Sequence, residues 1–251
     1  MKVGYVILYE DGTLTISKEH IILSHKNYMY FGEFEDNDCP WNNETNKIKT
    51  VQILDKVNPT TVTRWFQDCK KLTTLIDFQN LDVSDCKDFS YLFYSCHSLI
   101  DITTLVNWNV SNGKIFSHMF QGCESLTDIS ALINWDVSNG KDFISMFEDC
   151  ELLQDISVLS NWNVANGEDF SFMFYSCESL QNINELQNWN VSNGKDFLFM
   201  FANCKNLKII QLPQTLTNLK ENMFRNCNKD LKIHWKNRIY TYEDLLEYET
   251  F

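Results

Sequence analysis

The chain has 251 residues, of which 44% are hydrophobic and 14% aromatic, a composition that supports a folded core and argues against an intrinsically disordered protein. Its formal net charge of −13 argues against direct binding of DNA or RNA, because phosphate contacts require clustered lysine and arginine side chains. The same charge is compatible with a basic protein partner or with simple solubility.

Residues 1–60 differ in composition from the rest of the chain, and we expect them to form a β-rich N-terminal cap. Asp11-Gly12 lies between two strand-like runs and predicts a hairpin. Further strands are expected in residues 25–34 and 48–54, and residues 35–46 read as an exposed loop.

The first apolar run is interrupted by Glu10 and Asp11, and no small-residue cleavage site follows it. This pattern does not predict a signal peptide, and the chain contains no uninterrupted apolar stretch of about 18 residues that would predict a membrane helix. We therefore expect no membrane association.

A 27-residue repeat dominates residues 61–227, which we expect to form one solenoid. Six cysteines recur every 27 residues and a seventh follows after 23: Cys69, Cys96, Cys123, Cys150, Cys177, Cys204 and Cys227. The text between them repeats too, as in CESLTDISALINWDVSNGKDFISMF. Such a period is the signature of units that bury their apolar faces against their neighbours.

The apolar columns of the repeat predict its local structure. Each of the first six cysteines is followed by a leucine and then a leucine or isoleucine at three-residue steps, as in Leu126 and Ile129. One short apolar run per repeat predicts parallel strands stacked about 4.8 Å apart. The run that includes Phe143 and Met146 has helical spacing. We expect an α/β repeat, a right-handed leucine-rich-repeat solenoid with parallel strands on its concave face and short helical turns on its convex face.

Polar residues of the repeat predict where each coil bends. An asparagine precedes each repeat tryptophan, as Asn134 precedes Trp135, and we expect this column to form an internal amide ladder. The Asn-Gly pairs, such as Asn139-Gly140, predict turns in which positive φ is tolerated. Residues 228–251 are expected to close the stack with a hairpin and a short helix, as a C-terminal cap.

With its Leu-x-x-Ile runs, Met-Phe pairs and spaced cysteines, the chain resembles the BspA-like bacterial leucine-rich-repeat family. The 27-residue units resemble those of mycoplasma surface lipoproteins, and the 23-residue unit with Leu212-Pro213 resembles the Treponema-type repeat. The resemblance covers about residues 61–233 and implies the fold. It does not select a function, because the family includes adhesins, ligand binders and intracellular proteins. Its surface members carry an export signal, which is not visible here.

The cysteine column predicts small buried thiols. Stacked cysteines have parallel Cβ vectors that aim poorly for disulfides, and no CxxC spacing indicates a metal site. Reduced thiols favour a reducing compartment, so we expect a cytoplasmic location. The histidines are scattered, the carboxylates recur in repeat register and no Gly-rich phosphate loop is present. We therefore expect a protein that is not an enzyme, with no catalytic residues, metal or cofactor.

Two surfaces are candidates for binding. The first is an acidic stripe expected on the concave face, composed of Asp101, Asp128, Asp155, Glu124, Glu151 and Glu178. The second is a set of variable positions beside the Met-Phe pairs, at Tyr91, Tyr94, His118, Phe172, Tyr175 and Phe199. A solvated face and packing between helical turns are the respective alternatives.

We expect a protein–protein interaction module that binds a basic partner through its acidic surface. One alternative is an intracellular inhibitor of a nucleic-acid-handling enzyme, such as a host-defence nuclease, which would act in the host cytoplasm if encoded by a phage or mobile element. The other alternative is a bacterial cell-surface adhesin. The sequence does not indicate an oligomeric state.

Overall fold

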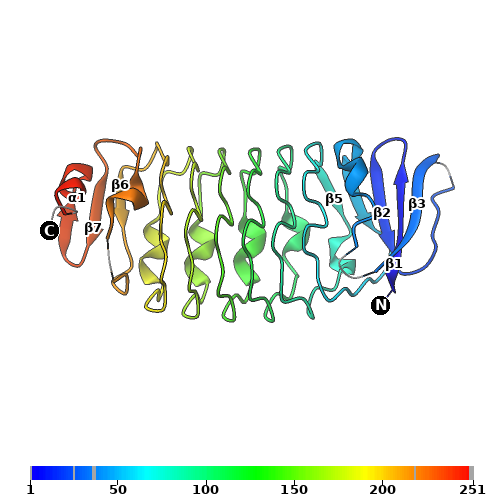
Figure 1. Cartoon of the computed structure of the whole chain (residues 1–251), viewed down its shortest axis with the longest axis horizontal. Helices are drawn as coiled ribbons and strands as arrows, with labels where there is room; N and C mark the ends of the chain where they lie inside the picture. Colours follow the sequence, from blue (N-terminus) through cyan, green and yellow to red (C-terminus); the bar gives the residue numbers. More distant parts are fainter. Residues whose placement is uncertain (1, 25, 36–37, 218, 249–251) are drawn as a thin grey trace.

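The computed structural model describes residues 2–24, 26–35, 38–217 and 219–248. The chain forms an elongated row of coils stacked side by side, with the two termini at opposite ends (Figure 1). Successive coils are joined by backbone hydrogen bonds between residues about one repeat apart, such as the bond from Lys141 N–H to Lys114 O at 2.9 Å. The row therefore has one continuous core along its length.

The N-terminal end of the row is a five-stranded sheet of order β3-β1-β2-β4-β5. Its strands are β1 (Lys2–Tyr9), β2 (Thr13–Ser17), β3 (Tyr28–Glu35), β4 (Thr50–Ile53) and β5 (Thr74–Ile76). β1 pairs antiparallel with β2 and β3, whereas β2, β4 and β5 are parallel. Gly12 has a φ of 88° in the β1–β2 turn, and Asp11 Oδ1 accepts a hydrogen bond from Thr13 N–H at 2.9 Å. The hairpin sheet thus continues directly into the first coils.

The expectation of an exposed loop over residues 35–46 was wrong for its central residue. Trp41 has 0% exposure, and its Nε1–H donates to the carbonyl oxygen of Trp65. Its ring meets those of Phe34 and Trp65 edge-on, at centroid distances of 5.5 and 6.0 Å. The short 3₁₀ helix η1 (Asn42–Lys47) follows. This segment closes the N-terminal end of the core because its one large aromatic residue fills it.

The strands expected at the Leu-x-x-Ile runs are absent from the described middle coils. Instead, each of these runs ends in a short 3₁₀ helix: η3 (Thr103–Leu105), η4 (Ser130–Asn134), η5 (Ser157–Asn161) and η6 (Asn184–Asn188). The first and last runs do form parallel strands, β5, which is followed by the 3₁₀ helix η2 (Phe78–Asn80), and β6 (Ile209–Gln211). The cause in the middle coils is local. In the coil of η4, Asp128 Oδ1 accepts a hydrogen bond from Ser130 N–H at 2.7 Å and bends the chain directly after the apolar run.

The expected helical turns after each Asn-Gly pair are also wrong, because the backbone there forms a row of consecutive tight turns. Ser145 N–H donates across to Ser171 O of the next coil at 3.0 Å, whereas Met146 N–H donates within its own coil to Phe143 O at 3.3 Å. Ser145 has a φ of 53°, which an α-helix does not permit. Alternation between the two kinds of bond joins the coils along this face.

Identical side chains stack from coil to coil inside the row. Phe120 and Phe147 lie parallel at 5.7 Å, and Trp135 Nε1–H donates to Leu105 O at 3.2 Å. Cys150 is free, fully buried and donates from Sγ to Phe120 O at 3.3 Å, so the thiol satisfies a carbonyl of the preceding coil. Burial of one such phenylalanine contributes about 1.5–3 kcal/mol to folding.

The repeat asparagines and glycines play different roles from those expected. Asn134 is exposed, and the amide ladder is formed by the asparagine of the Asn-Gly pair: Asn139 Nδ2–H donates to Ser111 O at 2.8 Å. Gly140 is not among the positive-φ glycines. A Cβ at Gly140 would lie 2.5 Å from Cζ of Phe143, so glycine is required here by close packing and not by φ.

The C-terminal end is a three-stranded sheet of order β6-β7-β8, with β6 (Ile209–Gln211) parallel to β7 (Lys232–Trp235) and β7 antiparallel to β8 (Arg238–Tyr240). The 3₁₀ helix η7 (Glu221–Phe224) lies between β6 and β7 in the chain, and the helix α1 (Tyr242–Tyr248) follows β8 at the end of the row (Figure 1).

Candidate interaction surfaces

The aspartates of the acidic stripe are exposed at equivalent positions of successive coils, and each one also shapes its turn. Asp101 Oδ1 accepts a hydrogen bond from Thr103 N–H at 2.7 Å, and Asp155 Oδ1 accepts one from Ser157 N–H at 2.8 Å. Asn182 makes the same bond to Asn184 N–H at 2.8 Å in the next coil. Because an amide forms this turn equally well, the turn does not require the negative charge of the aspartates.

The glutamates of the stripe occupy a second column, next to the cysteines. Glu124 Oε1 lies 3.7 Å from His97 Nε2, Glu178 forms an ion pair with Lys205, and Glu151 is exposed. Exposed ion pairs of this kind contribute at most about 1 kcal/mol to stability. A positively charged partner can therefore still interact with these carboxylates.

The variable aromatic positions form two clusters on the face made by the tight turns. In the first, Tyr91 stacks on His118 at 4.4 Å, Tyr94 lies 5.5 Å from Tyr91, and the Arg64 guanidinium lies 4.8 Å from the Tyr91 ring. His118 Nδ1 is hydrogen-bonded to Gln121 Oε1 at 2.6 Å. These side chains are half-buried, so packing between coils accounts for part of each surface.

The second cluster joins Phe172 to Tyr175 at 5.6 Å and to Phe199 at 5.3 Å. Phe172 and Phe199 have φ values of 57° and 55°, and Tyr91 and His118 have the same left-handed backbone. Each non-glycine residue in this conformation costs about 1 kcal/mol or more. The inter-coil hydrogen bonds hold the strained turns, and no sequence signal marks the positive φ because the column varies between aromatic, histidine and serine.

Three carboxylates that the sequence did not single out lie in the coil between the two clusters. Burial raises the pKa of Asp142, Glu148 and Asp149 above the usual range of carboxyl groups. Asp142 accepts a hydrogen bond from Ile144 N–H at 3.0 Å, which opposes that rise in pKa. The tight-turn face therefore alternates aromatic, acidic and aromatic along the row.

The chain matches the model of DUF285, described as Mycoplasma protein of unknown function, over residues 60–181, 103–210 and 130–235. Together these matches span well over half of the sequence. The chain belongs to this family. No curated protein shows significant similarity to it.

The described part of the DUF285 chain contains no group of three or more histidine, cysteine, aspartate or glutamate residues placed to hold a metal ion. None of its described helices has both the length and the hydropathy needed to cross a bilayer.

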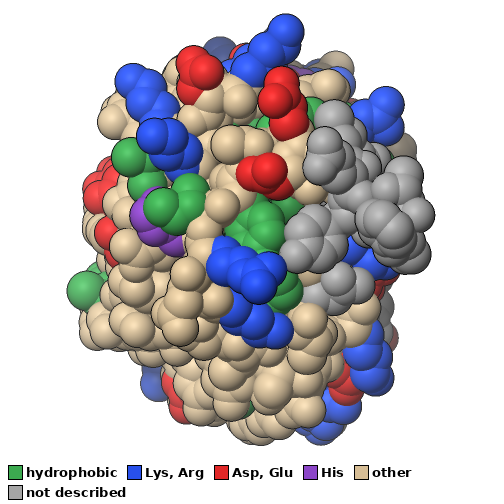
Figure 2. Space-filling view, turned by 90° about the vertical axis from the view of Figure 1, so that its left-hand side faces the viewer, with side chains coloured by type: hydrophobic (Ala, Val, Ile, Leu, Met, Phe, Trp, Pro, Cys, Tyr) green, Lys and Arg blue, Asp and Glu red, His purple; other side chains and the backbone are tan. Residues whose placement is uncertain are grey.

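Charge is unevenly distributed along the DUF285 chain. Residues 61–194 contain 18 acidic and 6 basic residues, a net charge of −12, whereas residues 195–238 contain 9 basic and 3 acidic residues, a net charge of +6. Figure 2 looks onto the C-terminal end, where lysine and arginine side chains lie beside hydrophobic ones and acidic side chains are also present. The negative charge expected from the overall composition is thus greatest in the central coils, and residues 239–251 add four acidic residues and no basic one. A count in windows along the sequence would have shown this.

Proposed function

We propose that this DUF285 protein is a non-enzymatic interaction module that binds a basic protein partner through the acidic surface of its central coils. The carrying observation is the exposed charge of Asp101, Asp128 and Asp155, which the fold does not need, because Asn182 forms the same turn without it. Because the fold does not require the negative charge of these aspartates, that charge is available to bind a positively charged partner.

We further propose that the stacked coils are a leucine-rich-repeat solenoid of the BspA-like type. The 27-residue period, the buried leucine and isoleucine columns and the parallel bridges from Asp88 to Ile115 and from Ile115 to Asp142 support this assignment. If this assignment is correct, we expect the coils to wind in a right-handed sense.

A reducing compartment such as the cytoplasm suits the cysteine column, and we propose this location. Burial raises the pKa of the Cys96 and Cys150 thiols well above the usual range. Thiols in this state act as small apolar side chains, and each donates to a carbonyl of the preceding coil. Neutral buried thiols also support a packing role over nucleophilic chemistry.

The test compares two triple variants that remove the same charge. D101N/D128N/D155N neutralises the aspartates of the stripe and keeps each turn, as Asn182 shows. D85N/D136N/D230N neutralises three exposed aspartates elsewhere. Cross-linking in the native host at low salt identifies the partner, and the affinity of the purified pair is then measured against salt concentration.

We expect the stripe variant to weaken binding at least about tenfold and to flatten the salt dependence, because about three screened charge contacts are lost. The control variant should bind nearly as the wild type does. Equal affinities of the two variants would reject the stripe as the binding surface.

A second candidate is inhibition of a nucleic-acid-handling enzyme. The carboxylates of the stripe recur once per coil and so form a line of negative charge along the row, which matches the basic channel of such an enzyme. Competition between the protein and duplex DNA for one purified nuclease would support inhibition, and simultaneous binding of both would reject it.

A further inference from the structure

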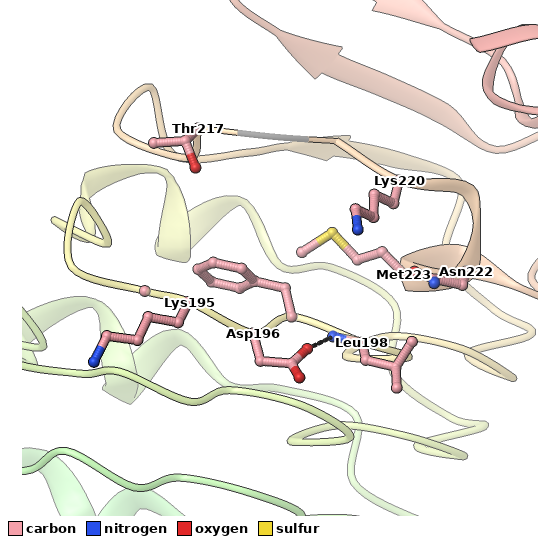
Figure 3. A pocket seen from close by; sticks show the side chains of 9 residues that line it. Lys195, Asp196, Leu198, Thr217, Lys220, Asn222 and Met223 are labelled. Carbon is pink, nitrogen blue, oxygen red and sulfur yellow. Dashed lines mark hydrogen bonds between the residues drawn. The ribbon is translucent and has the colours of Figure 1, made fainter. Parts of the chain in front are cut away.

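We propose that the junction before the last coil binds a planar aromatic carboxylate. This inference is independent of the proposed protein-binding surface. A cavity of about 260 Å³ lies at this junction, and its lining includes Phe197, Leu198, Lys220, Asn222 and Met223 (Figure 3). The cavity occurs where the repeat shortens from 27 to 23 residues.

One face of the cavity is the end of a stack of phenylalanine rings. Adjacent rings of the stack lie 5.3–5.5 Å apart and are parallel to within 7°: Phe89, Phe116, Phe143, Phe170 and Phe197. The first four rings have 0% exposure, whereas Phe197 is only half-buried. The stack therefore ends on a ring with no aromatic neighbour on its outer side among the described residues.

Lysine occupies the position where a sixth ring would continue the stack. The spacing of 23 residues that relates Phe201 to Phe224 also relates Phe197 to Lys220. In Figure 3 the Lys220 ammonium points toward Met223, whereas the Lys195 side chain extends away from it. Lys195 is paired with Glu168. Where the repeat would place a sixth phenylalanine ring, this chain therefore has the cavity and the Lys220 ammonium group.

A backbone donor is also left over at this junction. Phe170 N–H donates to Asp196 O of the next coil at 2.9 Å, but the equivalent Phe197 N–H has no acceptor within the described ranges. The Asp196 carboxylate already accepts a hydrogen bond from Leu198 N–H at 2.8 Å. Within the described ranges, the Phe197 N–H and the Lys220 ammonium are two donors at this cavity that suit an anion.

The stacking surface is preformed. A Cβ at Gly194 would lie 2.3 Å from Cζ of Phe197, and Phe170 lies parallel to the ring on its inner side. Because the Phe197 ring is already held in place by Phe170, ligand binding would cost little free energy for ordering this side chain. A flat ring would stack on Phe197 and contact the Met223 thioether, while its carboxylate would reach Lys220.

The probe is 2-naphthoate, titrated into the full chain labelled with ¹³C at the methionine methyl groups. Stacking at the cavity should shift the Met223 methyl signal strongly and saturably by ring current. Met146 is fully buried in a middle coil and should not shift, which makes it an internal reference. Neutral 2-naphthalenemethanol and non-planar cyclohexanecarboxylate should each bind at least about tenfold more weakly, because each lacks one half of the recognised chemistry.

The variants K220Q and K229Q separate the site from general basic charge, since Lys229 is also an exposed lysine of the C-terminal region but does not line the cavity. K220Q should weaken 2-naphthoate binding about tenfold and K229Q should not. F197L should abolish the shift while circular dichroism confirms folding. No Met223 shift at millimolar probe, or equal binding by K220Q and K229Q, would overturn the proposal.

A free aromatic acid and the C-terminal phenylalanine of a peptide present the same chemistry. Acetyl-Gly-Phe and its amide distinguish them: binding of the acid and not the amide assigns peptide termini to the site as well. If 2-naphthoate alone binds, the ligand is a free acid. If neither probe binds, the proposed binding site is rejected. The acidic-stripe proposal would be unaffected, because it is tested by the affinity of the protein partner for the aspartate variants.

Discussion

The strictest test of the packing is the substitution of Gly140 by alanine or asparagine. A Cβ at this position would lie 2.5 Å from Phe143 Cζ and 2.9 Å from Val137 O. The Phe143 ring lies parallel to rings of both neighbouring coils, at 5.5 and 5.4 Å, and therefore has no free direction in which to move. Overpacking of this kind costs about 1–3 kcal/mol, and the fixed carbonyl places Gly140→Ala toward the upper end of that range.

Gly122 supplies the matched control. It has a φ of 71°, and equivalent positions in other coils hold Asn203 and Asp149 at φ values of 63° and 56°. Because asparagine tolerates this backbone, Gly122→Asn should change the free energy of unfolding by less than about 1 kcal/mol. Urea unfolding followed by tryptophan fluorescence gives both values from the shift in midpoint.

The two explanations of the repeat glycine give opposite orders of stability. If close packing is the reason, Gly140→Asn is at least as damaging as Gly140→Ala, because both residues introduce a Cβ. If positive φ were the reason, Gly140→Asn would be the milder change. A Gly140→Asn variant as stable as the wild type, or a Gly122→Asn variant as damaged as Gly140→Ala, would refute the packing argument.

Three further predictions follow from buried groups. Trp135→Phe should destabilise the protein by about 0.5–1.5 kcal/mol in urea unfolding, because it removes the Nε1–H bond to the Leu105 carbonyl, which keeps its bond from Trp108 N–H. Cys150 should resist a thiol reagent at pH 8 until denaturant is added, since burial raises its pKa and suppresses the thiolate; reaction at the rate of an exposed thiol would contradict this. Burial also raises the pKa of Glu148 and Asp149 in the folded state. Above these raised pKa values the two carboxylates are ionised in the folded protein, which lowers the free energy of unfolding. This loss of stability disappears as the pH falls through the raised pKa values and both groups become protonated. E148Q/D149N should therefore raise the urea midpoint at pH 7 and have a smaller effect at pH 4; a gain that is larger at pH 4 would reverse the inferred sign.

The repeat period and the buried columns could be read from the sequence because they depend on spacing alone. A leucine such as Leu126 recurs every 27 residues, and residues that recur in this way pack on their own copies. The predicted strands form at the first and last runs, as β5 and β6, but not in the middle coils. There the sequence shows the apolar spacing but not the bond from Asp128 Oδ1 to Ser130 N–H, which bends the chain directly after the run. Local side-chain bonding overrides the strand signal at this point.

Other features could not be assigned to the correct role because several columns had the same period. Asn134 and Asn139 recur equally, and only the folded coil shows that Asn139 forms the ladder while Asn134 faces solvent. Trp41 lies outside the repeat, so no period marks it as a core residue. Both surfaces of the candidate site stay predictions, because their residues are exposed or half-buried and no partner has been placed on them.

Several ladders of side-chain hydrogen bonds together fix the number of residues in each coil. The asparagine amides reach back 28 residues, as Asn139 does to Ser111, while the cysteine thiols and tryptophan indoles reach back 30. Loss or gain of a single residue would put all of these bonds out of step together, whereas loss or gain of a whole 27-residue unit would leave every one intact. Among the 27-residue coils, the length of the molecule along its axis and the number of carboxylates it displays should therefore change by whole units, whereas the last coil, of 23 residues, keeps the cysteine bond over a shorter step, from Cys227 Sγ to Phe201 O.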